Sequence, residues 1–313
     1  MIERLFVPLD GSAEAESVLP WLRAWNLRSS KLILFHCLPS RLPKGEVLGN
    51  SRFETPEQAA SYLETIAAAL PGETEIIVRT GFPGDRIVTA ALQAEADLVV
   101  LGGNGEYGSP RTLGKVTEMV ARTCPLPVLL VKTPIGSLHR RIRRILVPLD
   151  MNARGDENME VLRGIAGDLR AEVVLLHVGS PEPEGAEVAA GLRQGADSES
   201  QLHQMHQIWN FLKDSIAVSD VRLNLIHQVW AFLKKEIAAR TVMTKGSFVE
   251  ETLSHERSLD ADIVAVTRDG TGLGLPWNAI VRQSERAVLL YEHKDPNSTS
   301  MIPVVRDRAL LPS

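Results

Sequence analysis

The sequence predicts an α/β fold with two doubly wound domains, each built on a five-stranded parallel sheet. The chain has 313 residues, about twice the ~150 of a common domain. Residues 5–10 recur as residues 145–150, an offset of 140 residues that matches one domain. Both halves also contain short, continuous runs of Val, Ile and Leu, which are typical of strands that helices cover on both faces.

The first elements follow in the same order in both halves. The first strand leads into a segment with helical spacing, residues 13–24 in the first half. An apolar run ending in His comes next, at residues 32–36 and again at residues 173–177. A second helical segment follows at residues 56–70. This alternation predicts a βαβ series with right-handed crossovers, which place helices on both faces of the sheet.

The later runs are spaced identically in the two halves. Gly81 lies 16 residues before Asp97, and Gly246 lies 16 residues before Asp262. Each of these aspartates opens an apolar run, and one more short run closes each half. The four runs are residues 97–101, 127–131, 262–266 and 287–291. Each half therefore offers about five strands.

The predicted domain boundaries follow from this repeat. The segments are a first domain at 1–137, a linker at 138–144, a second domain at 145–293 and a C-terminal tail at 294–313. The linker is basic from His139 to Arg144, which indicates a solvated connector; the alternative is a docking patch for an acidic partner.

A local duplication departs from the repeat. Residues 206–217 return 21 residues later as residues 227–238, with eight of twelve positions identical. The second copy fills the usual helix before the third strand, so the first copy is an extra helix within an insertion at about 180–225. We interpret the pair as a helical hairpin with Trp209 and Trp230 at its seam or against a partner.

Composition excludes several classes of protein. The chain has 39 acidic and 34 basic residues, a net charge of −5, so it lacks the positive field that nucleic-acid binding needs. No apolar run approaches the ~20 residues that span a membrane. The first ten residues read as a strand rather than as a signal peptide, so we expect a cytoplasmic protein. Cys37 and Cys124 sit beside apolar runs and are expected to be buried thiols.

An ordered set of motifs resembles the universal stress protein domain. The set comprises Val-Pro-Leu-Asp-Gly at 7–11, the strand ending in His36, a glycine loop at Gly102, and residues 114–118 leading into 124–131. The resemblance implies a five-stranded parallel domain of the adenine nucleotide alpha-hydrolase-like type, which pairs with another like itself. Tandem members pair their halves within one chain. One branch of the family binds ATP.

That branch is marked by Gly-x-x-Gly, nine residues, and then Gly followed by Ser or Thr. The first half has Gly102 and Gly105, then eight residues, then Gly114 and Lys115. The loop is one residue short, and Lys115 replaces the hydroxyl, although its charge can still neutralise phosphate. The resemblance gives Asp10 a role in holding adenosine; the alternative is that Asp10 caps the following helix. The expected cofactor is ATP or another adenine nucleotide, in the first domain alone.

The second half departs further from the pattern. Only three residues separate Gly270 from Gly274, and Asp269 adds a negative charge, so no nucleotide is expected there. Asp150 is expected to cap a helix rather than hold a ligand. Gly-x-Gly-x-x-Gly at 103–108 follows the fourth strand instead of the first, which argues against a dinucleotide site. Residues 109–116 lack the first glycine and the final hydroxyl of a Walker motif.

Three classes of function follow from these observations. The first is a tandem stress-response or regulatory protein with a nucleotide in its first domain; the second acts through protein contacts without a nucleotide. The third, an enzyme, has the least support: His36 and His177 end core strands, so no catalytic residue is assigned, and at most slow ATP hydrolysis is expected. His203, His206 and His227 lack an acid or thiol to complete a metal site. The expected partners are the chain's own other half as an internal pseudo-dimer, a second copy in a homodimer and an unidentified protein, but no nucleic acid or membrane.

Overall fold

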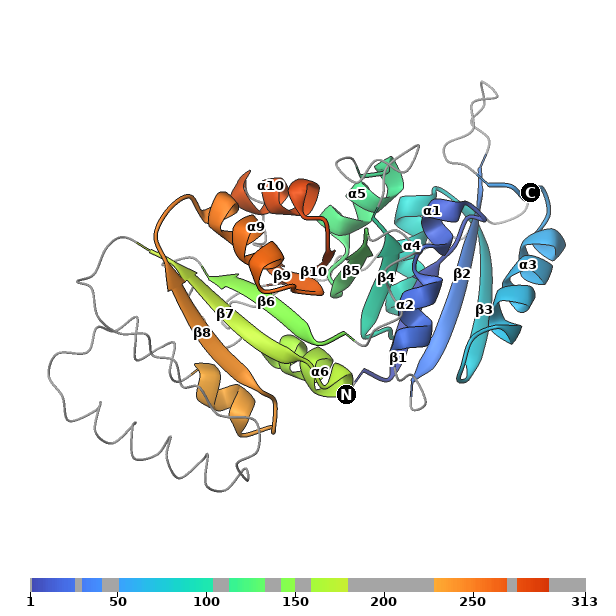
Figure 1. The fold of residues 1–313 in the computed structure, drawn as a ribbon. Coiled ribbons are helices and arrows are strands. Elements are labelled where there is room, and N and C mark those ends of the chain that lie inside the picture. The colour runs from blue at the N-terminus through green and yellow to red at the C-terminus, as the bar shows by residue number, and fades with distance from the viewer. Residues whose placement is uncertain are drawn as a thin grey trace, which may run out of the picture.

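Ten strands form one continuous sheet, in the order β3-β2-β1-β4-β5-β10-β9-β6-β7-β8 (Figure 1). The computed structural model describes residues 2–25, 30–40, 51–103, 113–132, 142–149, 159–179, 228–268 and 275–292. The strands are β1 (Arg4–Pro8), β2 (Lys31–Pro39), β3 (Thr74–Gly81), β4 (Leu98–Gly102), β5 (Val128–Val131), β6 (Arg144–Leu149), β7 (Glu172–Val178), β8 (Ala239–Thr244), β9 (Ile263–Arg268) and β10 (Ala287–Glu292).

Each half is a parallel sheet, and the two halves join edge to edge. Within a half, β1 pairs with β2 and β4, and β6 pairs with β7 and β9, all in parallel. At the seam β10 pairs with β5 antiparallel, with Leu289 opposite Leu129. The α/β fold class predicted from the sequence is confirmed, and the halves pack against each other as the predicted internal pseudo-dimer requires.

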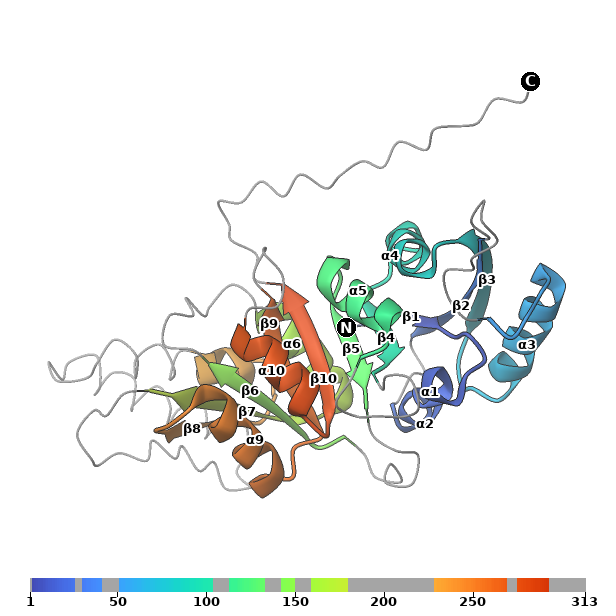
Figure 2. The same cartoon turned by 90° about the horizontal axis from the view of Figure 1, so that it is seen from above.

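Helices cover both faces of the sheet. The helices are α1 (Ala13–Glu16), α2 (Leu19–Ala24), α3 (Pro56–Ala68), α4 (Pro83–Gln93), α5 (Lys115–Thr123), α6 (Met159–Leu169), α9 (Phe248–Ser258) and α10 (Leu275–Gln283). In the first half α4 and α5 lie on one face, and α1 and α2 lie on the other (Figure 2).

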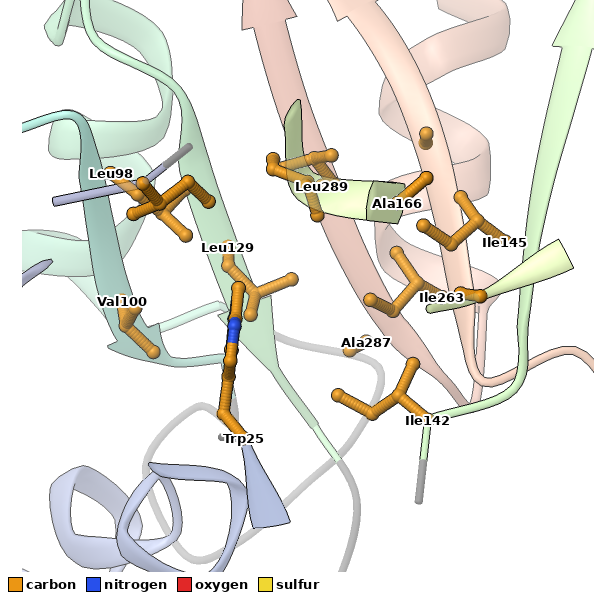
Figure 3. Packing of buried hydrophobic residues seen from close by; sticks show 14 of the residues in the cluster. Trp25, Leu98, Val100, Leu129, Ile142, Ile145, Ala166, Ile263, Ala287 and Leu289 are labelled. Carbon is orange, nitrogen blue, oxygen red and sulfur yellow. The ribbon is translucent and has the colours of Figure 1, made fainter. Parts of the chain in front are cut away.

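Alternate residues of β1 belong to two different hydrophobic clusters. Leu5 and Val7 share one cluster with residues of α2, α3 and α6, whereas Phe6 belongs to another cluster with residues of α4, α5 and α10. This is why the strands read as continuous apolar runs: both of their faces are buried. The first cluster crosses the seam, where Leu129 and Leu289 face each other among residues of both halves (Figure 3).

The glycine–aspartate spacing found in the sequence has one structural role in both halves. Gly81 ends β3, and Gly246 lies two residues after the end of β8. Their φ angles are +150° and +140°, values that favour glycine. One carboxylate oxygen of Asp97 accepts from the N–H groups of Glu3 and Arg4, at 2.8 and 2.9 Å. The equivalent oxygen of Asp262 accepts from the N–H groups that open β6. Each aspartate therefore anchors the start of its half's first strand.

Several predictions fall outside the described residues. These are the insertion, the first copy of the duplicated helix with Trp209, the C-terminal tail and most of the linker. From the second copy, residues 228–233 are helical, and Val229 and Phe232 lie in the core. The ammonium group of Lys234 lies 3.6 Å from the centre of the Trp230 ring. β6 begins at Arg144, the last residue of the predicted linker.

Candidate functional site

The predicted site residues of the first half lie at the carboxyl end of its sheet. The strand order 3-2-1-4-5 reverses between β1 and β4, because the chain runs outward to β3 and then returns to the other side of β1. Open α/β sheets bind ligands beyond the carboxyl ends of the strands at such a reversal. Asp10 follows β1, and Gly102 ends β4, so both border this point.

Asp10 shapes the turn that starts α1. Its Oδ1 accepts from the N–H of Ser12 at 2.9 Å, and Gly11 between them has a φ of +81°. Ser12 is the N-cap, since its Oγ accepts from the N–H of Ala15 at 3.1 Å. The capping alternative for Asp10 is therefore wrong in its detail: Asp10 holds the capping residue and does not cap the helix itself.

The packing of the chain itself requires glycine at position 102, independently of any ligand. A Cβ at this position would lie 2.2 Å from the backbone oxygen of Glu14 in α1. Gly103 is similarly close-packed: its N–H donates to the Val131 carbonyl at 2.7 Å, and a Cβ there would lie 2.9 Å from Cγ of Lys132. The two glycines let α1 and the residue after β5 approach the end of β4.

The start of α5 lies beside the end of β4. Thr117 Oγ1 donates to the Gly102 carbonyl at 3.1 Å, which ties the first turn of α5 to that strand. Gly114 is the N-cap and makes no side-chain capping bond, and Lys115 begins the helix with an exposed side chain. The first N–H groups of α5 therefore lack a side-chain cap, a feature that favours anions. Gly105 lies outside the described residues.

An aromatic group beside Asp10 was not found from the sequence. Phe53 stacks on Tyr62 with ring centroids 4.8 Å apart, and the His36 ring lies edge-on to Phe53 at 5.2 Å. A Cβ on Gly11 would lie 3.1 Å from the Phe53 ring, so this ring lies against the turn after Asp10. No local periodicity links these residues; they come together because α3 and the residues just before it lie against β2.

His36 has a structural role, as expected. It is fully buried. Its Nδ1 lies 2.6 Å from the Leu9 carbonyl, and its Nε2 lies 2.9 Å from Ser51 Oγ. Burial lowers the pKa of the imidazole, which keeps it neutral near pH 7. With both ring nitrogens occupied, His36 is not placed to act as a general base. His177 is also buried at the end of its strand.

In the second half, an arginine stands where the glycine loop begins. Leu5 is in register with Leu98, and Ile145 is in register with Ile263, so Thr267 corresponds to Gly102 and Arg268 to Gly103. The Arg268 guanidinium is buried and donates to the carbonyls of Ala121 and Leu126 in the first half, both at 2.9 Å. The sequence pattern pointed to Asp269 but not to its neighbour Arg268. Asp150 and Asp269 lie outside the described residues.

The described ranges contain neither a cluster of metal-binding side chains nor a helix suited to a membrane. Among those residues, no three His, Cys, Asp or Glu side chains are grouped so that they could hold a metal ion. In the same part of the chain, no helix has both the length and the apolar character needed to cross a membrane.

Comparisons with known proteins connect the site to one family. Residues 1–132 match the Universal stress protein family. A curated relative from Thermus aquaticus, "Universal stress protein in QAH/OAS sulfhydrylase 3'region", is 29% identical over 141 residues, which cover 42% of this chain and 100% of the relative.

Two solved structures resemble the chain across both halves. A universal stress protein from Archaeoglobus fulgidus is 16% identical, with 93% of this chain and 97% of that one covered and a TM-score of 0.60. A putative universal stress protein from Pseudomonas aeruginosa is 14% identical, with 93% of each chain covered and a TM-score of 0.54. These likenesses show that the fold is shared along nearly the whole chain.

Proposed function

We propose that this chain, whose residues 1–132 match the Universal stress protein family, is a tandem stress-response or regulatory protein that binds ATP or another adenine nucleotide in its first half. The second half binds no nucleotide in this proposal and serves as a pairing partner. The observation that carries it is the juxtaposition of Asp10, the end of β4 and the start of α5 at the reversal of strand order.

Each residue of the proposed site has a distinct role. In this proposal the Asp10 carboxylate accepts hydrogen bonds from the adenosine part. In the same proposal the backbone N–H groups of Gly102, Gly105 and Gly114 donate to phosphate oxygens. Lys115 begins α5 with an exposed ammonium group, which adds a flexible positive charge to the helix N-terminus.

At most slow hydrolysis of ATP is part of the proposed function. Attack of water on a phosphate is assisted by a group that accepts the proton. The His36 imidazole, which lies edge-on to Phe53 beside the turn after Asp10, already has both nitrogens within hydrogen-bond distance of Leu9 and Ser51. The described residues therefore assign no catalytic base.

Titration calorimetry with ATP on Lys115→Ala, Asp10→Ala and Asp269→Ala tests the site. Loss of the charge-assisted contact of Lys115 is expected to weaken binding by roughly 1.5 to 3 kcal/mol, or about 10- to 150-fold. Asp269→Ala is the control in the half without a site, and it is expected to change affinity little. Wild-type protein that binds no ATP at millimolar concentration refutes the nucleotide proposal, and equal losses in all three variants show that the site is misplaced.

A second candidate function is a protein that acts through contacts without a nucleotide. The observation that favours it is the packing of Gly102 and Gly103, since both glycines are required by neighbouring atoms of the chain itself. Native mass spectrometry of the purified protein separates the two functions. A nucleotide carried through purification supports the first, and a bare chain that also fails to bind added ATP supports the second.

The remaining expectations belong to the same proposal. The domains are residues 1–137 and 145–293, with an insertion at about 180–225. The protein is cytoplasmic, and it acts through a second copy of itself or another protein. Cell fractionation and measurement of mass in solution test these statements.

A further inference from the structure

In each half, one buried cationic side chain crosses the seam between β5 and β10 and contacts the last helix of the other half. From the second half, Arg268 donates to the carbonyl of Ala121 in α5 and to that of Leu126 just after this helix. From the first half, Lys132 donates to the carbonyl of Val281 in α10, with that of Ser284 at 3.4 Å. Both side chains are at most 2% exposed. Each cation thus meets carbonyls at a helix C-terminus, which favours positive charge.

The two cations come from different places in the repeat. Lys132 follows β5, and it passes over Gly103, whose missing side chain leaves the room. Arg268 occupies the position that corresponds to Gly103, at the end of β9. Where the first half has a glycine of the loop, the second half therefore has a residue whose side chain reaches α5. Arg268 thus connects this position of the second half with the helix at the proposed phosphate site of the first half.

The helix that Arg268 reaches is the one that begins at the proposed phosphate site. α5 has nine residues, a length of about 13 Å. Thr117 ties its first turn to β4, and Glu118 in its middle binds Arg282 of α10 at 3.0 Å. Arg268 holds its last turn. A helix of this length is stiff and shifts as one body. A displacement of its last turn at Ala121 therefore also changes the direction of the N–H groups near Gly114.

We propose that Arg268 is a positioning residue through which the second half fixes α5 and thereby sets the affinity of the first half for nucleotide phosphate. This inference rests on the proposed function. Loosening the seam lowers nucleotide affinity, and by thermodynamic linkage nucleotide binding tightens the seam. A protein partner or modification that acts on the second half can then regulate the first half from across the sheet.

The experiment uses the full chain and two readouts. Amide hydrogen exchange across α5 is measured without nucleotide, and ATP affinity is measured by calorimetry, for wild type, Arg268→Met and Arg268→Lys. Arg286→Met is the matched control, because Arg286 pairs with Asp260 inside the second half at 3.2 Å.

In Arg268→Met, exchange in α5 is expected to accelerate by at least about tenfold, the factor for one charge-assisted hydrogen bond. Exchange in β1 and β4 is expected to stay unchanged. ATP affinity is expected to fall by at least about fivefold. Arg268→Lys keeps the charge with a single donor group and is expected to recover part of both effects. Arg286→Met is expected to leave both readouts as in wild type.

The outcomes separate this inference from the proposed function. Unchanged exchange in α5 overturns the inference, whatever happens to ATP affinity. Faster exchange with unchanged ATP affinity also overturns it, because α5 would then be fixed by Arg268 without any effect on the site. Wild-type protein that binds no ATP refutes the proposed function and the affinity claim, while the exchange readout still decides whether Arg268 fixes α5. Should Arg268→Met fail to fold, Arg268→Lys carries the same test.

Discussion

Replacing Lys132 with methionine is expected to change how the stability of the protein depends on pH. Lys132 is 1% exposed at the end of β5, and its ammonium group donates to the carbonyl of Val281. Burial lowers the pKa of Lys132 from 10.5 to about 8, although the nearby Glu256 carboxylate opposes this effect. The folded protein therefore gives up this proton at a lower pH than the unfolded chain does.

The direction and size of the effect follow from that difference. Between pH 8 and 10.5 the unfolded state binds more protons at this residue than the folded state, so stability rises with pH. One pKa unit corresponds to about 1.4 kcal/mol, so the full effect is about 3 kcal/mol. The cost of burying the charge is fully present below pH 8, and it is relieved as the pH rises through that value. Lys132→Met carries no such charge and lacks this gain.

The assay is urea unfolding of wild type and Lys132→Met from pH 7 to 10.5. The free energy of unfolding of wild type minus that of the variant is expected to increase by about 3 kcal/mol over this range. The Cys37 thiol, whose pKa burial raises to about 11, lowers stability from about pH 9 upward, but it is present in both proteins and cancels.

Lys31→Met is the control for this measurement. Hydrogen bonds to Glu75 and Glu73 raise the pKa of Lys31, so its contribution to stability is lost as the pH rises above 10.5. For this variant the difference from wild type is not expected to increase with pH. A flat difference for Lys132→Met between pH 7 and 10.5 would refute the reasoning and would mean that water reaches the ammonium group at the seam.

Three further predictions concern packing. Gly102→Ala places a Cβ 2.2 Å from the Glu14 oxygen and is expected to cost at least about 2 kcal/mol in urea unfolding; Gly114→Ala, whose nearest neighbour is Thr117 Oγ1 at 3.8 Å, is its control and is expected to cost less than about 1 kcal/mol. Ser12→Ala removes the cap of α1 and is expected to cost about 1 kcal/mol, whereas no measurable loss would show that Asp10 alone maintains the turn. The halves expressed separately are expected to associate, because separation exposes the apolar residues of β5 and β10; two monomeric halves in analytical ultracentrifugation would contradict this.

The sequence by itself determined the α/β fold and the repeat. Burial on both faces of a parallel strand requires continuous apolar runs, and these runs are visible one residue after another. The spacing from Gly81 to Asp97 is equally local: the glycine ends one strand, and the aspartate lies a fixed helix length away, where it holds the start of β1. The same spacing separates Gly246 from Asp262, and Asp262 holds the start of β6 in the same way.

Part of the candidate site could also be predicted. Asp10, Gly102, Gly114 and Lys115 were selected because strand ends and helix starts have recognisable sequence signals, and in a parallel sheet these ends meet at one edge. The aromatic group of Phe53, Tyr62 and His36 could not be found in this way. Its members come from separate elements, and nothing in their spacing along the chain links them.

Only the tertiary structure decided what the glycines and the seam residues do. A glycine looks the same in a sequence whether a phosphate or a helix backbone approaches it, and at Gly102 the structure shows the backbone of Glu14. Arg268 and Ala121 are 147 residues apart, yet they are joined by a buried hydrogen bond. Such contacts depend on the antiparallel pairing of β5 with β10, which no local pattern encodes. The regulatory role proposed for Arg268 became visible only when the two halves were seen in one sheet.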